Sequence, residues 1–198
     1  DKRVDRVMEF AAEGTDTVQT SLTNYILDAE VENLVYTGTS ALVGFSGVGN
    51  ALDNEISGGV ASDDLQGGDG NDTLIGGLGN DALTGGAGFD AASYATSTAG
   101  VTVSLLTGVS SGGAGADRLQ SIESLIGSAF NDALTGDAGN NTLEGGAGND
   151  TLVGGAGVDT VSYASAQSGV SVTLGTQFTI AALSVLAQQN TQGAGSDR

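Results

Sequence analysis

The sequence predicts an all-β solenoid, in which very short strands stack along one axis, and three observations support this prediction. A nine-residue pattern, GGxGxDxUx with a large apolar residue U, occurs twice in succession between Gly67 and Thr84. The chain has 34 glycines, no proline and 5% aromatic residues, which suits a thin structure that buries one small side chain per strand. A nine-residue unit cannot bury its apolar residue alone, so it is stable only when it stacks on copies of itself.

Each part of the repeat predicts one local structure. The hexapeptide GGxGxD combines glycines, which tolerate positive φ, with one carboxylate, and it predicts a tight turn rich in bare backbone carbonyls. The tripeptide xUx predicts a strand whose middle residue, such as Leu74 or Leu83, points inward. We therefore expect turns and strands to alternate along the array.

The aspartates at position six of the repeat are expected to face one another in pairs. If one repeat makes half a coil, repeats two apart lie above one another. Carboxylates stacked roughly 4.8 Å apart repel strongly unless a cation lies between them. An irregular cage of carboxylate and carbonyl oxygens fits Ca²⁺ better than Mg²⁺. The expected pairs are Asp63 with Asp81, Asp72 with Asp90, Asp132 with Asp150, and Asn141 with Asp159, and a fifth joins Asn54 to Asp72. The pairs predict about four or five calcium ions.

The two nonapeptides resemble the RTX (repeats-in-toxin) or haemolysin-type calcium-binding repeat family. The resemblance implies a right-handed parallel β-roll with calcium in its turns, held by the aspartate at position six and by carbonyls near the glycines at positions two and four. It also implies secretion, by the type I route, to the extracellular space or the cell surface. At the matching positions the implied ligand residues are Asp63, Asp72, Asp81, Asp90, Asp132, Asn141, Asp150, Asp159, Gly68, Gly70, Gly77, Gly79, Gly86, Gly88, Gly146, Gly148, Gly155 and Gly157.

The first half of the chain divides into a degenerate segment and a regular array. Residues 1–48 are expected to form a β-rich cap or irregular coil, since Gly14, Asp16 and Val18 match the core of the repeat. Residues 49–95 form the first array. Its position-six residues recur at intervals of nine and are Asn54, Asp63, Asp72, Asp81 and Asp90. Its inward apolar residues keep the same step and are Ile56, Leu65, Leu74 and Leu83. We expect weaker calcium binding at its Asn54 end.

The second half repeats this organisation after a connector. Residues 96–126 are expected to form longer β-strands, with Val101, Val103 and Leu105 inward, and one isolated repeat containing Asp117. Residues 127–164 form the second array, and residues 165–198 begin a further module that is cut short. The position-six residues of the second array are Asp132, Asn141, Asp150 and Asp159, followed inward by Leu134, Leu143, Leu152 and Val161. The natural interpretation is a piece of a longer array of modules of about 70 residues.

Several acidic and polar residues lie outside the regular pattern. The neutral amide oxygens of Asn54 and Asn141 can still bind a cation. We expect Asp117 to lie outside the stacking register, because six extra residues separate it from the second array. Asp69 and Asp137 are expected to be solvated. Asp16, Asp117 and Asp197 are interpreted as plain turn caps, and Glu32 and Glu123 as solvated strand residues rather than stray calcium ligands.

Two tyrosines follow the last turn of each array. Tyr94 and Tyr163 occur in the shared sequence SYA. We expect them to plug the open end of the apolar channel rather than to bind a sugar, because a solenoid must cover its exposed leucines.

Composition excludes several functions. A net charge of −19 disfavours nucleic acids and anionic membranes as partners, and no run of 18 apolar residues predicts a membrane-spanning helix. Neither cysteine nor histidine is present, so disulfides and thiolate or imidazole metal sites are excluded. The paired carboxylates are better explained by metal than by acid–base catalysis, and no nucleophile elbow, zinc-protease or phosphate-loop motif occurs, so no enzyme is expected.

The leading hypothesis is a calcium-binding structural module of a secreted or cell-surface bacterial protein, of adhesin or surface-layer type, that folds on calcium outside the cell. Neighbouring copies or adjacent modules are further candidate partners. The alternative is the RTX carrier region of a secreted hydrolase or polysaccharide-modifying enzyme. Ice binding is disfavoured, because position three holds Asp69, Leu78 and Ala87 instead of a threonine row.

Overall fold

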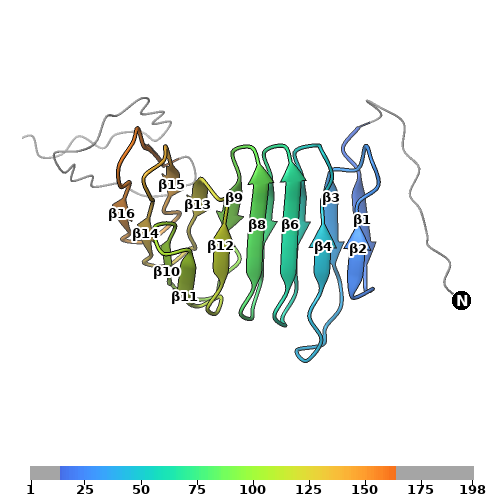
Figure 1. Cartoon of the computed structure of the whole chain (residues 1–198). Coiled ribbons are helices and arrows are strands. Elements are labelled where there is room, and N and C mark those ends of the chain that lie inside the picture. Colours follow the sequence, from blue (N-terminus) through green and yellow to red (C-terminus); the bar gives the residue numbers. More distant parts are fainter. Residues whose placement is uncertain (1–13, 164–198) are drawn as a thin grey trace, which may run out of the picture.

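A computed structural model describes residues 14–163, which form two facing β-sheets and no helix. Figure 1 shows the strands side by side along one long axis, as expected of a solenoid. The first sheet contains, in spatial order, β1 (Thr17–Thr20), β3 (Asn33–Tyr36), β5 (Glu55–Ser57), β7 (Thr73–Ile75), β9 (Ala91–Ser93), β13 (Ser124–Ile126), β15 (Thr142–Glu144) and β17 (Thr160–Ser162). The second contains β2 (Asn24–Ile26), β4 (Ser46–Val48), β6 (Asp64–Asp69), β8 (Ala82–Ala87), β12 (Arg118–Gln120), β11 (Val109–Gly112), β10 (Val101–Ser104), β14 (Ala133–Thr135) and β16 (Thr151–Val153).

Within both arrays one coil is made of two nonapeptides. The chain passes from one sheet to the other at each turn, so that Leu74 of β7 lies beside Ile56 of β5, and Leu83 of β8 lies beside Leu65 of β6. The second array repeats this parallel register, with Leu152 beside Leu134. The predicted parallel β-solenoid is confirmed. Residues 14–163 contain no helix long and apolar enough to span a bilayer.

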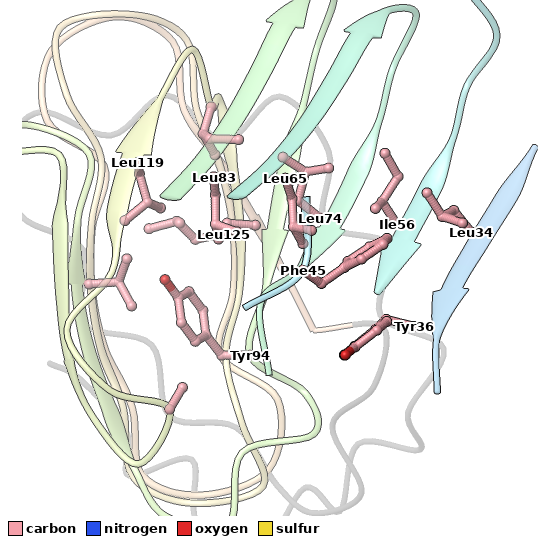
Figure 2. Close-up of a cluster of buried hydrophobic side chains, with 14 of the residues drawn as sticks. Leu34, Tyr36, Phe45, Ile56, Leu65, Leu74, Leu83, Tyr94, Leu119 and Leu125 are labelled. Atoms are coloured by element: carbon pink, nitrogen blue, oxygen red, sulfur yellow. The ribbon is translucent and has the colours of Figure 1, made fainter. Parts of the chain in front are cut away.

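Buried apolar side chains, most of them from the strands, fill the space between the sheets. These side chains form a continuous row, ten of which are labelled in Figure 2. Ile56, Leu65, Leu74, Leu134 and Leu143 have no exposed surface. Because full burial of such a side chain contributes about 1.5–3 kcal/mol, the row supplies the main driving force for stacking.

The connector inserts extra strands into one sheet only. Between β8 and β14 the second sheet contains β12, β11 and β10, whereas β13 alone separates β9 from β15 in the first sheet. The extra strands form antiparallel pairs, β10 with β11 and β11 with β12. As predicted, Val101 and Val103 point inward, but Leu105 lies beyond the end of β10 and is only partly buried.

The prediction that Asp117 lies outside the stacking register is wrong. β12 pairs in parallel with β8, so that Leu119 lies beside Leu83 and Asp117 follows Asp81 in the stack. The sequence spacing between Asp81 and Asp117 is twice that of two stacked repeats. β10 and β11 form a hairpin that lies within the second sheet, between β12 and β14, so β12 still pairs with β8 in register.

Tyr94 fills the widened core at this junction. Its side chain is 4% exposed and lies among the same inward side chains as Leu119 and Leu125 (Figure 2). The expectation that it closes an open end is wrong, because the channel continues past it into the second array. Tyr163, at the end of the described residues, is half-buried.

An aromatic pair fills the irregular coil near the start of the described chain. The rings of Tyr36 and Phe45 stack with centroids 4.6 Å apart and planes 8° from parallel. Here residues 37–45, rather than a glycine hexapeptide, connect β3 to β4. The predicted segment 165–198 and Asp197 lie outside the described residues.

Replacing Tyr94 tests its packing role. Tyr94→Ala should lower the free energy of unfolding by about 3–5 kcal/mol, because it leaves a cavity in the widened core. Tyr94→Phe should change it by less than about 1 kcal/mol, because the buried hydroxyl makes no hydrogen bond of standard geometry. Denaturant unfolding at saturating calcium measures both. Equal losses in the two variants would show that the hydroxyl, not the ring, matters.

Candidate calcium centre

A ladder of side-chain hydrogen bonds connects the turns. The backbone amides of six position-six residues each donate to a carboxylate oxygen of the position-six residue in the following coil. Asp63 donates to Asp81 at 2.9 Å, and Asp72 donates to Asp90 at 2.8 Å. The same contact joins Asn54 to Asp72, Asp81 to Asp117, Asp132 to Asp150 and Asn141 to Asp159. All five predicted pairs are therefore neighbours, and Asp117 joins the ladder.

Glycines at positions two and four shape the gap between stacked turns. All ten glycines that the sequence singled out have positive φ, for example 122° at Gly68 and 104° at Gly70. A Cβ on Gly68 would overlap the carbonyl oxygen of Asn50, and a Cβ on Gly70 would overlap that of Leu52. The position-two and position-four carbonyls of one coil thus point at the same positions of the next, so the gap is lined with acceptor oxygens.

The glycine at position one makes room for the carboxylate. A Cβ on Gly67 would overlap Oδ2 of Asp72, and a Cβ on Gly76 would overlap Oδ2 of Asp81. The first glycine of the motif is therefore required by contact with the sixth residue of its own turn.

The turns fall into two classes according to the second oxygen of the position-six side chain. In turns of the two arrays that keep glycine at positions two and four, this oxygen accepts no hydrogen bond from the described residues, and in Asp72, Asp81 and Asp90 it is also buried. We call these open turns. They are residues 67–72, 76–81, 85–90, 145–150 and 154–159. In the connector turn 112–117, Asp117 instead accepts a hydrogen bond from Ser110.

In the other four turns the position-six side chain accepts a bond from the position-two amide of its own turn. Gly59 donates to Asp63 at 2.6 Å, and Asp137 donates to Asn141 at 2.8 Å. These closed turns are residues 49–54, 58–63, 127–132 and 136–141. Gly59 and Gly139 do not have positive φ although both are glycine, because each turn has lost the other glycine, to Ala61 or to Asp137. Both glycines are needed to keep the turn open.

Burial makes the carboxylates of Asp72, Asp81, Asp90 and Asp150 unusually basic. Burial, reinforced by the charges of Asp90, Asp53 and Asp69, raises the pKa of Asp72 to about 6. Burial and the neighbouring charges of Asp117 and Asp63 raise the pKa of Asp81 to about 7. Burial also raises the pKa of Asp90 and of Asp150. These carboxylates therefore lack neutralising partners among the described residues.

Asparagine side chains connect each array to the coil that precedes it in the stack. The Asn50 amide nitrogen donates to the carbonyls of Asp28 and Val31, at 2.9 and 2.7 Å. The Asn141 amide nitrogen donates to the carbonyl of Glu123 at 3.3 Å. At these two places the coil beneath lacks a nonapeptide turn, and an NH₂ group faces its carbonyls.

Position five forms a second ladder, which the sequence interpretation missed because it treated this position as variable. The side chain at position five accepts from the position-five amide of the following coil, so this ladder runs opposite to the first. Asn71 accepts from Phe89, and Asn131 accepts from Asn149, both at 2.8 Å. The recurrent asparagine before the aspartate was the available signal.

Glu32 and Glu123 are not the solvated residues that the sequence interpretation proposed. Glu123 accepts a hydrogen bond from the amide of Asp90 at 2.9 Å, and Glu32 accepts one from the amide of Asp16 at 2.8 Å. Each takes the place of a position-six aspartate in the ladder. Asp69 is exposed as expected, whereas Asp137 is half-buried and accepts a bond from Gly139.

No three acidic side chains among residues 14–163 cluster closely enough to form a metal site from carboxylates alone. Each gap offers at most two position-six side chains, so the remaining ligands must be backbone carbonyls. This is the donor set that the nonapeptide provides.

A family model described as the RTX calcium-binding nonapeptide repeat matches residues 49–91 and 126–161, in four copies. The two arrays are RTX calcium-binding nonapeptide repeats. The comparison with curated proteins found no match. RTX repeats are structural, calcium-binding modules, not a catalytic fold.

Exchanging glycine and alanine at position four should convert one class of turn into the other. Gly79→Ala should close the turn 76–81 and weaken calcium binding, because alanine does not tolerate the φ of 127°. Ala61→Gly should open the turn 58–63 and strengthen binding. Isothermal titration calorimetry measures both changes.

A matched control for these two variants is Ala147→Gly, which adds a glycine at position three, where no positive φ is required. It should leave calcium affinity within about twofold of the parent chain. A similar gain in affinity from Ala147→Gly and Ala61→Gly would contradict the two classes of turn.

The metal-free fold should be more stable in mild acid. A carboxyl with a raised pKa stabilises the fold while it is protonated, and this contribution is lost as pH rises from the ordinary value of 3.8 through about 6 for Asp72 and about 7 for Asp81. In chelator, far-ultraviolet circular dichroism should show more β-structure at pH 5 than at pH 8. Calcium affinity should rise over the same interval, and a pH-independent affinity would contradict this.

Proposed function

We propose that the chain is a structural module that folds when calcium fills the gaps between its stacked turns. The single observation that supports this most strongly is the set of buried, unpartnered carboxylate oxygens on Asp72, Asp81 and Asp90. An unpaired buried charge is costly, so these oxygens require a cation or a proton. The acceptor-lined gaps can hold a cation, and the only basic side chain among residues 14–163, Arg118, is exposed on β12.

In this proposal each ion is held by a pair of position-six side chains and by position-two and position-four carbonyls. The strongest candidate gap lies between Asp72 and Asp90, where both turns are open. The other candidate gaps combine an open turn with a closed one: Asn54 with Asp72, Asp63 with Asp81, Asp132 with Asp150, and Asn141 with Asp159. About four or five ions per chain are expected.

Secretion is part of the proposal, because it gives the calcium dependence a use. Without metal, like charges lie at one strand spacing and the glycines cost conformational entropy, so the chain is expected to be unfolded. Extracellular calcium modules bind with dissociation constants of about 10⁻⁴–10⁻³ M, which lets a chain stay unfolded at low internal calcium and fold outside the cell. A rigid spacer in a cell-surface or surface-layer protein suits such a module. The repeats are also compatible with the carrier region of a secreted enzyme.

The proposal is tested by a calcium titration. Starting from chelated protein, calcium should drive a cooperative transition from coil to β-structure in far-ultraviolet circular dichroism, and magnesium at equal concentration should not. A chain fully folded in chelator at pH 8 with no response to calcium would refute calcium-driven folding.

Single amide substitutions extend this test. Asp72→Asn and Asp81→Asn should each raise the calcium concentration at the folding midpoint on the order of tenfold, because each removes a charged ligand. The exposed Asp69, which has the same charge at position three, is the matched control. Asp69→Asn should leave the midpoint nearly unchanged, and a shift as large as that of Asp72→Asn would indicate a general charge effect.

A further inference from the structure

Two short turns outside the nonapeptide pattern share a sequence pattern, a β-branched apolar residue followed by Glu, a polar residue and Leu, and they share one geometry. They are the segments Glu30–Leu34, which reads EVENL, and Ser121–Leu125, which reads SIESL. Each starts with a residue in the left-handed region, with φ of 66° at Glu30 and 51° at Ser121. Among residues 14–163 these are the only non-glycine residues with positive φ. In each segment a buried apolar residue, the glutamate and a fully buried leucine follow.

The glutamate of each turn lies against an aspartate of the preceding coil. The Glu123 carboxylate accepts from the backbone amide of Asp90, and the Glu32 carboxylate accepts from that of Asp16. Each glutamate carboxylate is therefore held at the backbone of an aspartate, in a contact that the nonapeptide pattern does not include.

The aspartate contributes an oxygen that has no partner. Asp90 has no exposed surface, one of its oxygens accepts from Asp72, and the other is buried without a hydrogen bond. A Cβ on Gly85 would overlap both the carbonyl oxygen of Ser121 and this free oxygen of Asp90. Acceptors from Asp90 and Ser121 thus face the same gap beside the Glu123 carboxylate. The second oxygen of Asp16 is likewise buried and unpartnered.

The left-handed conformation explains the position of the Ser121 carbonyl. In regular stacks the position-one carbonyl of the following coil, such as that of Gly85 above Gly67, occupies this place. Ser121 supplies the same oxygen from a turn of only three residues between β12 and β13. A non-glycine residue in this region is strained, and such strain persists where the surrounding structure requires it.

We propose that this glutamate turn builds a second kind of calcium site, between Asp90 and Glu123, and that Asp16 and Glu32 form a copy of it. The proposal rests on the calcium function proposed above. The only cationic side chain within residues 14–163 is Arg118, which is exposed on β12, so a neutralising cation must come from solution. Carboxylate and carbonyl oxygens in an irregular arrangement select Ca²⁺. The sites extend calcium binding to both places where the first sheet lacks a glycine turn.

Replacing the glutamates by glutamine tests the proposal. Glutamine keeps the oxygen that accepts from the Asp90 or Asp16 amide but removes the charge. Equilibrium dialysis with radioactive calcium should show one ion fewer per chain for Glu123→Gln, one fewer for Glu32→Gln, and two fewer for the double variant. The matched control is Glu55→Gln, an exposed glutamate on β5, which should bind as many ions as the parent chain.

The outcomes separate this proposal from the general calcium function. If the parent chain binds calcium and Glu123→Gln, folded by circular dichroism, binds the same number of ions with unchanged affinity, the glutamate site is refuted and the calcium function stands. A parent chain that binds no calcium overturns both. If Glu123→Gln does not fold at saturating calcium, Glu32→Gln decides by the same criterion, because its turn lies near the edge of the described sheet.

Discussion

Stacked carboxylates are the constraint on which the rest of this structure depends. The position-six side chains of successive coils lie next to one another in the stack. The carboxylate of one coil accepts a hydrogen bond from the backbone amide of the position-six residue in the preceding coil. This bond fixes the register of the turns, yet it brings negative charges to one strand spacing. The leucine row holds the strands together. The charges at the turns make that packing conditional on a cation or on protonation.

Glycine decides which turns depend on a cation. In the array turns with glycine at both positions two and four, the carbonyls point into the gap and one carboxylate oxygen is left free. With either glycine lost, the position-two amide rotates toward the carboxylate and satisfies it, as Gly59 does for Asp63. Loss of a glycine therefore replaces a metal ligand with an internal hydrogen bond. A degenerate repeat of this kind stabilises the solenoid without requiring an ion on that oxygen.

The irregular parts of the chain preserve the ladder by other means. β10 and β11 form a hairpin that is inserted into the second sheet between β12 and β14, so β12 still pairs with β8 in register, and Tyr94 fills the additional width. Asp117, the last member of that stack before the hairpin, is satisfied by the hydroxyl of Ser110 at 2.8 Å. Glu32 and Glu123 continue the ladder through longer side chains. The stacking of coils thus continues from the first array to the second although the nonapeptide pattern is interrupted.

The sequence alone determined the periodic features of this protein. A nine-residue step repeated without gaps fixes which residues share a face, so the parallel solenoid, the leucine row and the five position-six pairs followed from spacing. The sequence did not reveal what happens where the step breaks. Asp117 stacks on Asp81 because the β10–β11 hairpin lies on the other side of β12 in the second sheet. Glu123 contacts the backbone of Asp90 from a three-residue turn, and Tyr94 is internal because the apolar core continues past it. These features depend on contacts between residues far apart in the chain, which only tertiary structure decides.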